Sequence, residues 1–333
     1  MFIKQRIDLL VRLGEYMASN EPGWLEAKQK AFQENNWFIP EFVDRAAASI
    51  AVNFLQHDIL EAFTSRYQLP PKQEHPKKVG IVLAGNIPLV GFHDTLCVFL
   101  SGHYAVIKPS SKDEALIKHL VKKLSEWEPA AAPYFELRSM LKGCDAYIAT
   151  GSNNTSRYFE YYFRNYPTII RRNRTSVAVL TGKETASELG ELAEDVYQYF
   201  GLGCRNVTKL YVPRDYNFEL LLEAFSKYNY LINHHKYKNN YDYNLAAHIL
   251  NNQYYMTNGS IILVENPSPF SPISQLHWEY YDDEQAVRES LTDNEAIQCV
   301  VGSHYTSFGQ AQCPSIDTFA DGTDTVEFLK SLS

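Results

Sequence analysis

Short apolar runs alternate with helix-like segments over residues 79–149, and this alternation constrains the fold more than any other feature of the chain. The runs are Val79–Ala84, Tyr104–Ile107 and Ala146–Ala149, with helix-like segments at 89–101 and 113–127. Strands that alternate with helices at this spacing predict parallel βαβ units. Ligands of such sheets bind where the strands end.

The flanking segments extend this pattern into two α/β lobes. Residues 1–70 are predicted to be helical, and the proline-rich stretch 70–76 is predicted to be a link. Beyond residue 175, strands are expected at 177–180, 208–212, 261–264 and 297–301, and helices at 184–200, 215–256 and 283–291. We place the domain boundary between 1–178 and 179–333.

Composition excludes several classes of function. A net charge of −8 gives no basic face for nucleic acid. The five cysteines are far apart and odd in number, which argues against a disulfide framework or a zinc site. Neither a signal peptide nor an apolar run long enough to span a membrane is recognisable. We therefore expect a soluble cytoplasmic protein without a metal.

Cys204 is the strongest candidate for a reactive side chain. It follows Gly201 and Gly203 and precedes an apolar run, Leu210–Val212, so it lies between a predicted helix and a predicted strand. A thiolate at such a place can exchange acyl groups with a thioester. Free cysteines are also common as small buried apolar residues, and the sequence alone leaves both interpretations open.

Polar residues follow three predicted strands of the first lobe. Asn86 could donate to an oxyanion or simply precede a helix, and Lys108 could hold a ribose or phosphate or be solvated. Thr150, Gly151 and Ser152 could expose backbone N–H groups to a pyrophosphate or cap a helix. The arginines at 171, 172, 174 and 205 are interpreted as solvated basic residues. The alternatives are that they lower the pKa of the Cys204 thiol or bind CoA phosphates.

Taken in order, these segments resemble the aldehyde dehydrogenase superfamily, and most closely its long-chain acyl-CoA reductase (LuxC-type) branch. The resemblance runs from about residue 77 to the end and includes Gly85–Pro88, Val106–Ser111, Ala149–Ser152, Gly203–Cys204 and the segments 306–309 and 319–329. It implies an aldehyde-dehydrogenase-like fold with two Rossmann-like parallel-sheet lobes after a helical N-terminal segment. It also implies a dinucleotide-binding domain in 1–178 and a catalytic domain in 179–333.

The resemblance further implies roles for individual residues. Cys204 would be the nucleophile, with the Asn86 amide at the oxyanion, and Lys108, Ser111, Thr150, Gly151 and Ser152 would bind the cofactor. The general-base glutamate of the superfamily is missing, because Ile170–Asn173 stands in its place. Ser111 replaces the glutamate that usually binds both ribose hydroxyls, which favours NADPH over NADH.

The predicted function is therefore NADPH-dependent reduction of a long-chain fatty acyl-CoA to the aldehyde through a Cys204 acyl-enzyme. The alternatives are a cofactor-independent acyltransferase or thioesterase that uses the same cysteine, and a non-catalytic binding protein on this fold. The resemblance also implies a homo-oligomer. Luminescence is the best-known use of the branch, but the residues specify neither that pathway nor the acyl chain length.

Overall fold

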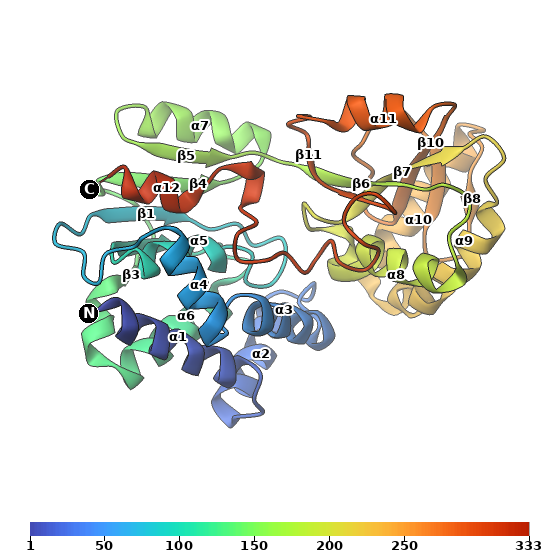
Figure 1. Ribbon diagram of the computed structural model, residues 1–333. Coiled ribbons are helices and arrows are strands. Elements are labelled where there is room, and N and C mark those ends of the chain that lie inside the picture. The colour runs from blue at the N-terminus through green and yellow to red at the C-terminus, as the bar shows by residue number, and fades with distance from the viewer. Residues whose placement is uncertain (333) are drawn as a thin grey trace. The chain divides into compact units, whose positions relative to one another are not determined.

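The computed structural model describes residues 1–332, with only the backbone of Asn153, and consists of two compact units (Figure 1). Unit 1 comprises Met1–Asn173 and the segment from Pro314 onward, and unit 2 comprises Arg174–Cys313. The chain passes from unit 1 to unit 2 between Asn173 and Arg174, whereas the sequence division places the boundary at residues 178 and 179. The C-terminal segment, which the sequence division placed with residues 179–313, packs with the N-terminal residues instead.

Unit 1 contains a parallel five-stranded sheet in the order β3-β2-β1-β4-β5. Its strands are β1 (Lys78–Val82), β2 (Tyr104–Lys108), β3 (Phe135–Leu137), β4 (Ala146–Thr150) and β5 (Thr168–Arg171). Its helices are α1 (Ile3–Met17), α2 (Pro22–Glu34), α3 (Pro40–Asn53), α4 (His57–Arg66), α5 (Phe92–Leu100), α6 (Glu114–Trp127), α7 (Asn153–Phe163) and α12 (Thr325–Lys330), with 3₁₀ helices η1 (Pro129–Tyr134) and η4 (Ala320–Gly322).

Unit 2 contains a six-stranded sheet in the order β11-β6-β7-β10-β9-β8, parallel except for the β8–β9 pair. Its strands are β6 (Thr175–Val179), β7 (Val207–Pro213), β8 (Met256–Thr257), β9 (Ile262–Glu265), β10 (Gln275–Tyr281) and β11 (Ile297–Val301). Its helices are α8 (Ala186–Tyr197), α9 (Phe218–Phe225), α10 (His235–Leu250) and α11 (Glu284–Leu291), with 3₁₀ helices η2 (Gln198–Gly201) and η3 (Ser226–Asn233).

Local sequence accounts for the elements that lead to the candidate site. The inner strands are built from buried apolar residues, as expected for a parallel sheet covered on both faces. Helix α8 begins with a capping box, in which the Thr185 hydroxyl accepts from Glu188 N and the Glu188 carboxylate accepts from Thr185 N. The predicted α/β class with two parallel, Rossmann-like sheets is confirmed.

The C-terminal segment completes the core of unit 1. Figure 1 shows α12, in red, among the blue and green elements of the N-terminal half. Val326 and Leu329 are fully buried in the same apolar cluster as residues of α1, α5 and β1. Burial of each such side chain contributes about 1.5–3 kcal/mol, so the fold of unit 1 depends on residues from both ends of the chain.

Arg171 lies at the end of β5 and is buried, so its interpretation as a solvated basic residue is wrong. Its guanidinium pairs with Asp94 of α5 at 2.7 Å, with 3% and 10% of the two side chains exposed. It also donates to the Thr325 hydroxyl at 2.8 Å and to the carbonyl of Ala320. Burial alone would raise the pKa of Asp94, but the charge of Arg171 and its hydrogen bonds hold that pKa below its usual value.

We predict that Arg171→Met lowers the free energy of unfolding by about 3–5 kcal/mol, because it leaves the Asp94 carboxylate buried without its cation. The neighbouring Arg172 is the matched control, since it is exposed and pairs with the exposed Glu160. Arg172→Met should cost less than about 1 kcal/mol. Denaturant titration followed by circular dichroism measures both values, and equal losses would contradict the structural role of Arg171.

Candidate functional site

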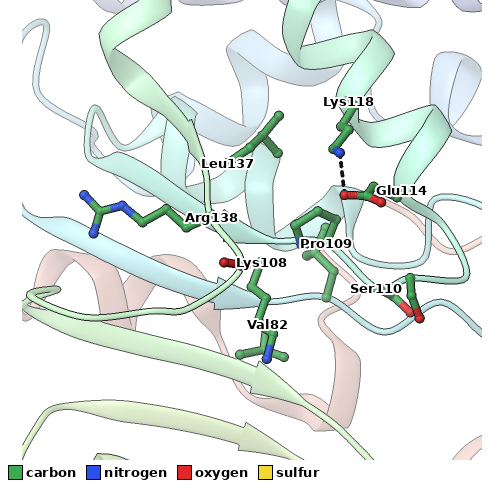
Figure 2. Close-up of a pocket in the computed structure, with 11 residues that line it drawn as sticks. Val82, Lys108, Pro109, Ser110, Glu114, Lys118, Leu137 and Arg138 are labelled. Atoms are coloured by element: carbon green, nitrogen blue, oxygen red, sulfur yellow. Dashed lines mark ion pairs between the residues drawn. The ribbon is translucent and has the colours of Figure 1, made fainter.

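A cavity of about 580 Å³ lies at the carboxyl edge of the unit 1 sheet (Figure 2). Residues from the ends of β1, β2 and β3 line it, together with the first turns of α6. Figure 2 shows Lys108 at the end of β2, Arg138 just after β3, and the ion pair between Glu114 and Lys118 on α6. This is the edge at which parallel α/β sheets bind ligands.

The cavity brings together two of the residues proposed from sequence. Lys108 is the last residue of β2, and Ser111 lies in the turn between β2 and α6. Both side chains are exposed, as a ligand contact requires. Arg138 adds a second cation that is held in place, because its guanidinium contacts both carboxylate oxygens of Glu136, at 2.5 and 2.7 Å, and the carbonyl of Lys142. Two of its five N–H donors are left for a ligand.

Asn86 lies in the loop between β1 and α5, and this loop packs against the Lys108–Ser111 turn. Leu83 N donates to the carbonyl of Lys108 at 3.1 Å. A Cβ atom at Gly85 would lie only 2.4 Å from the Ser110 hydroxyl, so a glycine is required for this close approach. Asn86 itself is partly exposed. The candidate oxyanion donor and the candidate cofactor lysine therefore lie on adjoining segments of unit 1.

Thr150, Gly151 and Ser152 lie at the end of β4, in the same sheet, but outside the residues that line the cavity. The Ser152 hydroxyl accepts from Thr155 N at 3.3 Å and caps α7. A Cβ at Gly151 would lie 2.9 Å from the ring of Phe159. The helix-cap interpretation of Ser152 is thus confirmed, while pyrophosphate binding at this helix start stays a prediction.

Cys204 lies in unit 2, in the turn between η2 and β7, and is partly exposed. The order of helix, turn and strand around it agrees with the sequence prediction, because α8 precedes it and β7 follows it. Its carbonyl accepts from the hydroxyl of Ser176 in β6 at 3.0 Å, which ties the turn to the neighbouring strand. The thiol is therefore placed at the end of an element on a turn with defined anchors.

The turn that carries Cys204 is held by the buried side chain of Asn206. Its amide nitrogen donates to three carbonyls at the end of α8, those of Asp195, Val196 and Gln198, at 3.0, 3.3 and 2.8 Å. Its oxygen accepts from Gly203 N at 2.7 Å. One amide thus caps the helix and fixes the residue before Cys204.

The backbone before this turn adopts an uncommon conformation. Tyr199, Phe200 and Gly201 all have positive φ, at 56°, 56° and 73°. Large side chains rarely adopt the left-handed region, and such strain persists only where the surroundings impose it. Both aromatic residues are buried, and the bonds of Asn206 enclose the segment on either side.

Asp195 connects α8 to the segment that follows β11. Its carboxylate, fully buried, accepts from Gly309 N at 2.7 Å and from Ala311 N at 3.0 Å. Burial raises the pKa of Asp195 to about 7, although the two backbone hydrogen bonds oppose the shift. Its backbone carbonyl is one of the acceptors of Asn206, so the carboxylate and the cysteine turn share one helix end.

The other cysteines differ from Cys204 in exposure. Cys97, Cys144 and Cys299 are buried, and burial raises the pKa of each of these three thiols. Cys313 is exposed, but it lies at the last position of unit 2. The buried thiols are held in the unreactive protonated form, as the sequence interpretation of them as core residues expects.

Sequence reasoning missed Arg138, Asn206 and Asp195. Arg138 follows a strand of only three residues, which shows no apolar run to mark it. Asn206 and Asp195 act through backbone groups brought together by the turn, and their sequence context shows no motif. A polar residue two positions after a candidate nucleophile was the single available signal, and it applied to Asn206.

Metal-binding clusters and membrane-spanning helices are both absent from residues 1–332. No group of His, Cys, Asp and Glu side chains in this part of the chain is arranged to hold a metal ion. None of its helices is both long and apolar enough to cross a membrane.

Comparison with known proteins yields one family and many solved structures. The family model described as acyl-CoA reductase (LuxC) matches residues 44–224, more than half of the chain. Among curated proteins, none matches.

Solved structures of aldehyde dehydrogenases match this fold. Aldehyde dehydrogenase 21 from Physcomitrella patens has a TM-score of 0.70 at 11% identity, over 100% of this chain and 84% of that one. The NAD-dependent aldehyde dehydrogenase from Sinorhizobium meliloti has a TM-score of 0.65 at 13% identity, over 93% and 72%. KauB from Pseudomonas aeruginosa has a TM-score of 0.66 at 14% identity, over 90% and 72%. At these identities the likeness shows the fold, which is that of the aldehyde dehydrogenases.

We predict a pH-dependent stability that originates at Asp195. Because its pKa is about 7 in the folded protein against 3.8 for the free side chain, the folded state binds this proton more tightly. The resulting stabilisation is complete below pH ~4 and is lost as the pH rises to ~7. Asp195→Asn removes the titration, so the Tm of the variant minus that of wild type should rise by at least ~3 °C between pH 4.5 and 7.5.

The matched control is Glu223→Gln on the exposed side of α9, whose Tm difference from wild type should not change with pH. Differential scanning fluorimetry in buffers of matched ionic strength gives both series. A Tm difference for Asp195→Asn that is constant from pH 4.5 to 7.5 would show that Asp195 titrates normally.

Proposed function

Since the chain belongs to the acyl-CoA reductase (LuxC) family, we propose that it reduces a long-chain fatty acyl-CoA to the aldehyde with NADPH, through an acyl-enzyme on Cys204. The observation that carries the proposal is the setting of Cys204, a partly exposed thiol on a turn that Asn206 and Ser176 anchor. We propose a homo-oligomer in the cytoplasm as the form that acts.

The first step is attack by the Cys204 sulfur on the thioester carbonyl. A carbon–sulfur bond to the enzyme forms, the bond to CoA breaks, and CoA leaves as a thiol with the proton that Cys204 gives up. The Asn86 amide and the Cys204 backbone N–H are the proposed donors to the tetrahedral oxyanion. When the enzyme carbon–sulfur bond breaks at the end of the reaction, the aldehyde is released and Cys204 regains its proton.

The cavity at the end of β1, β2 and β3 suits a phosphorylated dinucleotide. NADPH bound there would supply the hydride, in a reaction that consumes one NADPH and one proton per acyl group. Lys108 and Ser111 would contact the adenosine ribose, and the two remaining N–H donors of Arg138 would bind a 2′-phosphate. Glu114 is neutralised by Lys118 at 2.5 Å, so it repels a phosphate less than a free carboxylate would.

The absence of a carboxylate at Ile170–Asn173 favours reduction over hydrolysis. An aldehyde dehydrogenase that hydrolyses its thioester needs a general base for water, and this stretch offers arginines instead. Arg171 is committed to Asp94 and the C-terminal segment, so it is not available to a substrate. An acyl-enzyme protected from water would persist until it is reduced.

We predict that intact-protein mass spectrometry shows one acyl group on wild type after incubation with a long-chain acyl-CoA, and that NADPH removes it. Cys204→Ala should abolish the adduct, whereas Cys313→Ala should retain it, since Cys313 is the other exposed thiol. Asn86→Ala should acylate about 100- to 1000-fold more slowly, because one oxyanion donor is lost.

Other results would point to the alternatives. An adduct on Cys204 that NADPH does not discharge would indicate a thioesterase or acyltransferase. No adduct at any chain length would indicate a non-catalytic protein on this fold.

We also predict that Arg138→Ala lowers the preference for NADPH over NADH by about 10-fold or more, the effect of losing a charged hydrogen bond to phosphate. The affinity for NADH should change little, because NADH has no 2′-phosphate. Fluorescence titration of both cofactors measures the ratio without turnover. Lys142→Ala is the control, as an exposed cation close in sequence but outside the cavity; equal effects of the two variants would refute the assignment of Arg138.

A further inference from the structure

The carboxyl group of Asp113 lies at the start of helix α6 but does not cap that helix. Asp113 is the N-cap residue of α6, where aspartate usually accepts from backbone N–H groups of its own helix, but its side chain makes no such bond. It accepts instead from Leu89 N at 2.6 Å, in the loop that carries Asn86. The side chain is thus diverted from its own helix to the neighbouring loop.

Burial of the Asp113 carboxyl group is energetically unfavourable. Only 6% of Asp113 is exposed, and its second oxygen, Oδ1, has no hydrogen-bond partner within residues 1–332. Burial raises the pKa of this carboxyl well above its usual value, against the effect of the Leu89 hydrogen bond.

The residue that donates to Asp113, Leu89, has a strained backbone conformation. Leu89 has φ of 56°, in the left-handed region that a leucine seldom adopts. Its side chain is buried, and its N–H points to Asp113 rather than to solvent. Together with the bond from Leu83 N to the Lys108 carbonyl, this gives two hydrogen bonds between the loop and the segment from the end of β2 to the start of α6. Between them, Gly85 approaches Ser110 too closely for a side chain to fit.

We propose that Asp113 is a positioning residue that holds the 83–91 loop, and with it the Asn86 amide, against the Lys108–Ser111 turn. The proposal rests on the proposed role of Asn86 at the oxyanion. In this arrangement the hydrogen bond from Leu89 N to the Asp113 carboxylate fixes the position of the Asn86 loop relative to the cofactor turn. The loss of Asp113 then slows acylation through Asn86, while the cofactor contacts of Lys108 and Arg138 are retained.

The experiment compares Asp113→Ala with Asp113→Asn. Asparagine keeps an oxygen that accepts from Leu89 N, whereas alanine leaves that N–H without an acceptor. Asp324→Ala is the control for general loss of stability, since Asp324 caps α12 of the same unit and its carboxylate accepts from Val326 N, Glu327 N and the Tyr67 hydroxyl. Single-turnover acylation of Cys204 by acyl-CoA without cofactor, NADPH affinity by fluorescence, and hydrogen exchange of the 85–91 peptide are measured for each.

We expect Asp113→Ala to slow acylation by at least about 10-fold, a fraction of the loss of an oxyanion donor itself. The dissociation constant of NADPH should change by less than about 3-fold, and Asp113→Asn should restore the acylation rate to within about 3-fold of wild type. In the Asn86→Ala background, Asp113→Ala should cost nothing further, because the two residues act through one donor.

Three results would overturn the proposal. These are a normal acylation rate in Asp113→Ala, independent multiplying losses in the double variant, and an equal loss of rate in Asp324→Ala. If wild-type Cys204 takes up no acyl group, the proposed function fails, and hydrogen exchange decides the present inference by itself. Faster exchange of the 85–91 peptide in Asp113→Ala but not in Asp113→Asn then supports the positioning role of Asp113, and unchanged exchange refutes it.

Discussion

The buried ion pair of Arg171 with Asp94 is the interaction on which the rest of unit 1 depends. Arg171 lies two residues before the chain leaves this unit, and the groups it bonds besides Asp94 lie on the segment that returns to it, at Ala320 and Thr325. A single guanidinium therefore joins the end of β5, the helix after the Asn86 loop and the start of α12. Burial of the apolar side chains of Val326 and Leu329 stabilises the same contact, but it does not fix its geometry as the hydrogen bonds of Arg171 do.

The candidate residues of each unit lie on turns, and polar side chains give those turns their shape. The parallel sheets bring strand ends to a common edge, but they leave open where each loop lies. In unit 2, Asn206 and Asp195 use the carbonyls and N–H groups of α8 and of residues 309–311 to fix the path of the cysteine turn. In unit 1, Asp113 does the same for the Asn86 loop. Each of these groups is buried, and each bonds to backbone.

The sequence predicted the class of fold and the strands that are continuous apolar runs. It missed β3, β5, β8 and β10. Strands β3 and β8 have only three and two residues, β5 ends in an arginine whose burial depends on Asp94, and β10 carries His277 and Glu279. The pairing of Glu279 with the buried Lys209 of β7 offsets that polarity, and only the folded sheet reveals it.

The candidate residues divide in the same way. Cys204, Asn86, Lys108 and Ser111 follow strands or helices in sequence order, so the resemblance and the local pattern sufficed to propose them. Of the residues that hold them in place, Asp113 and Asp195 bond to groups 24 and 114 residues away, so no local pattern marks them. Asn206 acts within 11 residues, but it belongs to no recognisable motif. Glycines such as Gly85 gave a partial signal, since its close contact with Ser110 explains why no side chain fits there.

The order of the units along the chain has a consequence for biosynthesis. Unit 2 is one continuous stretch, Arg174–Cys313, inserted into unit 1, whose core needs α12 from beyond that stretch. On the ribosome, unit 2 is fully synthesised while the hydrophobic cluster of the first 173 residues still lacks Val326 and Leu329. The part that emerges first is therefore the last to be completed, and it carries an open apolar face during the interval, the condition in which nascent chains rely on chaperones.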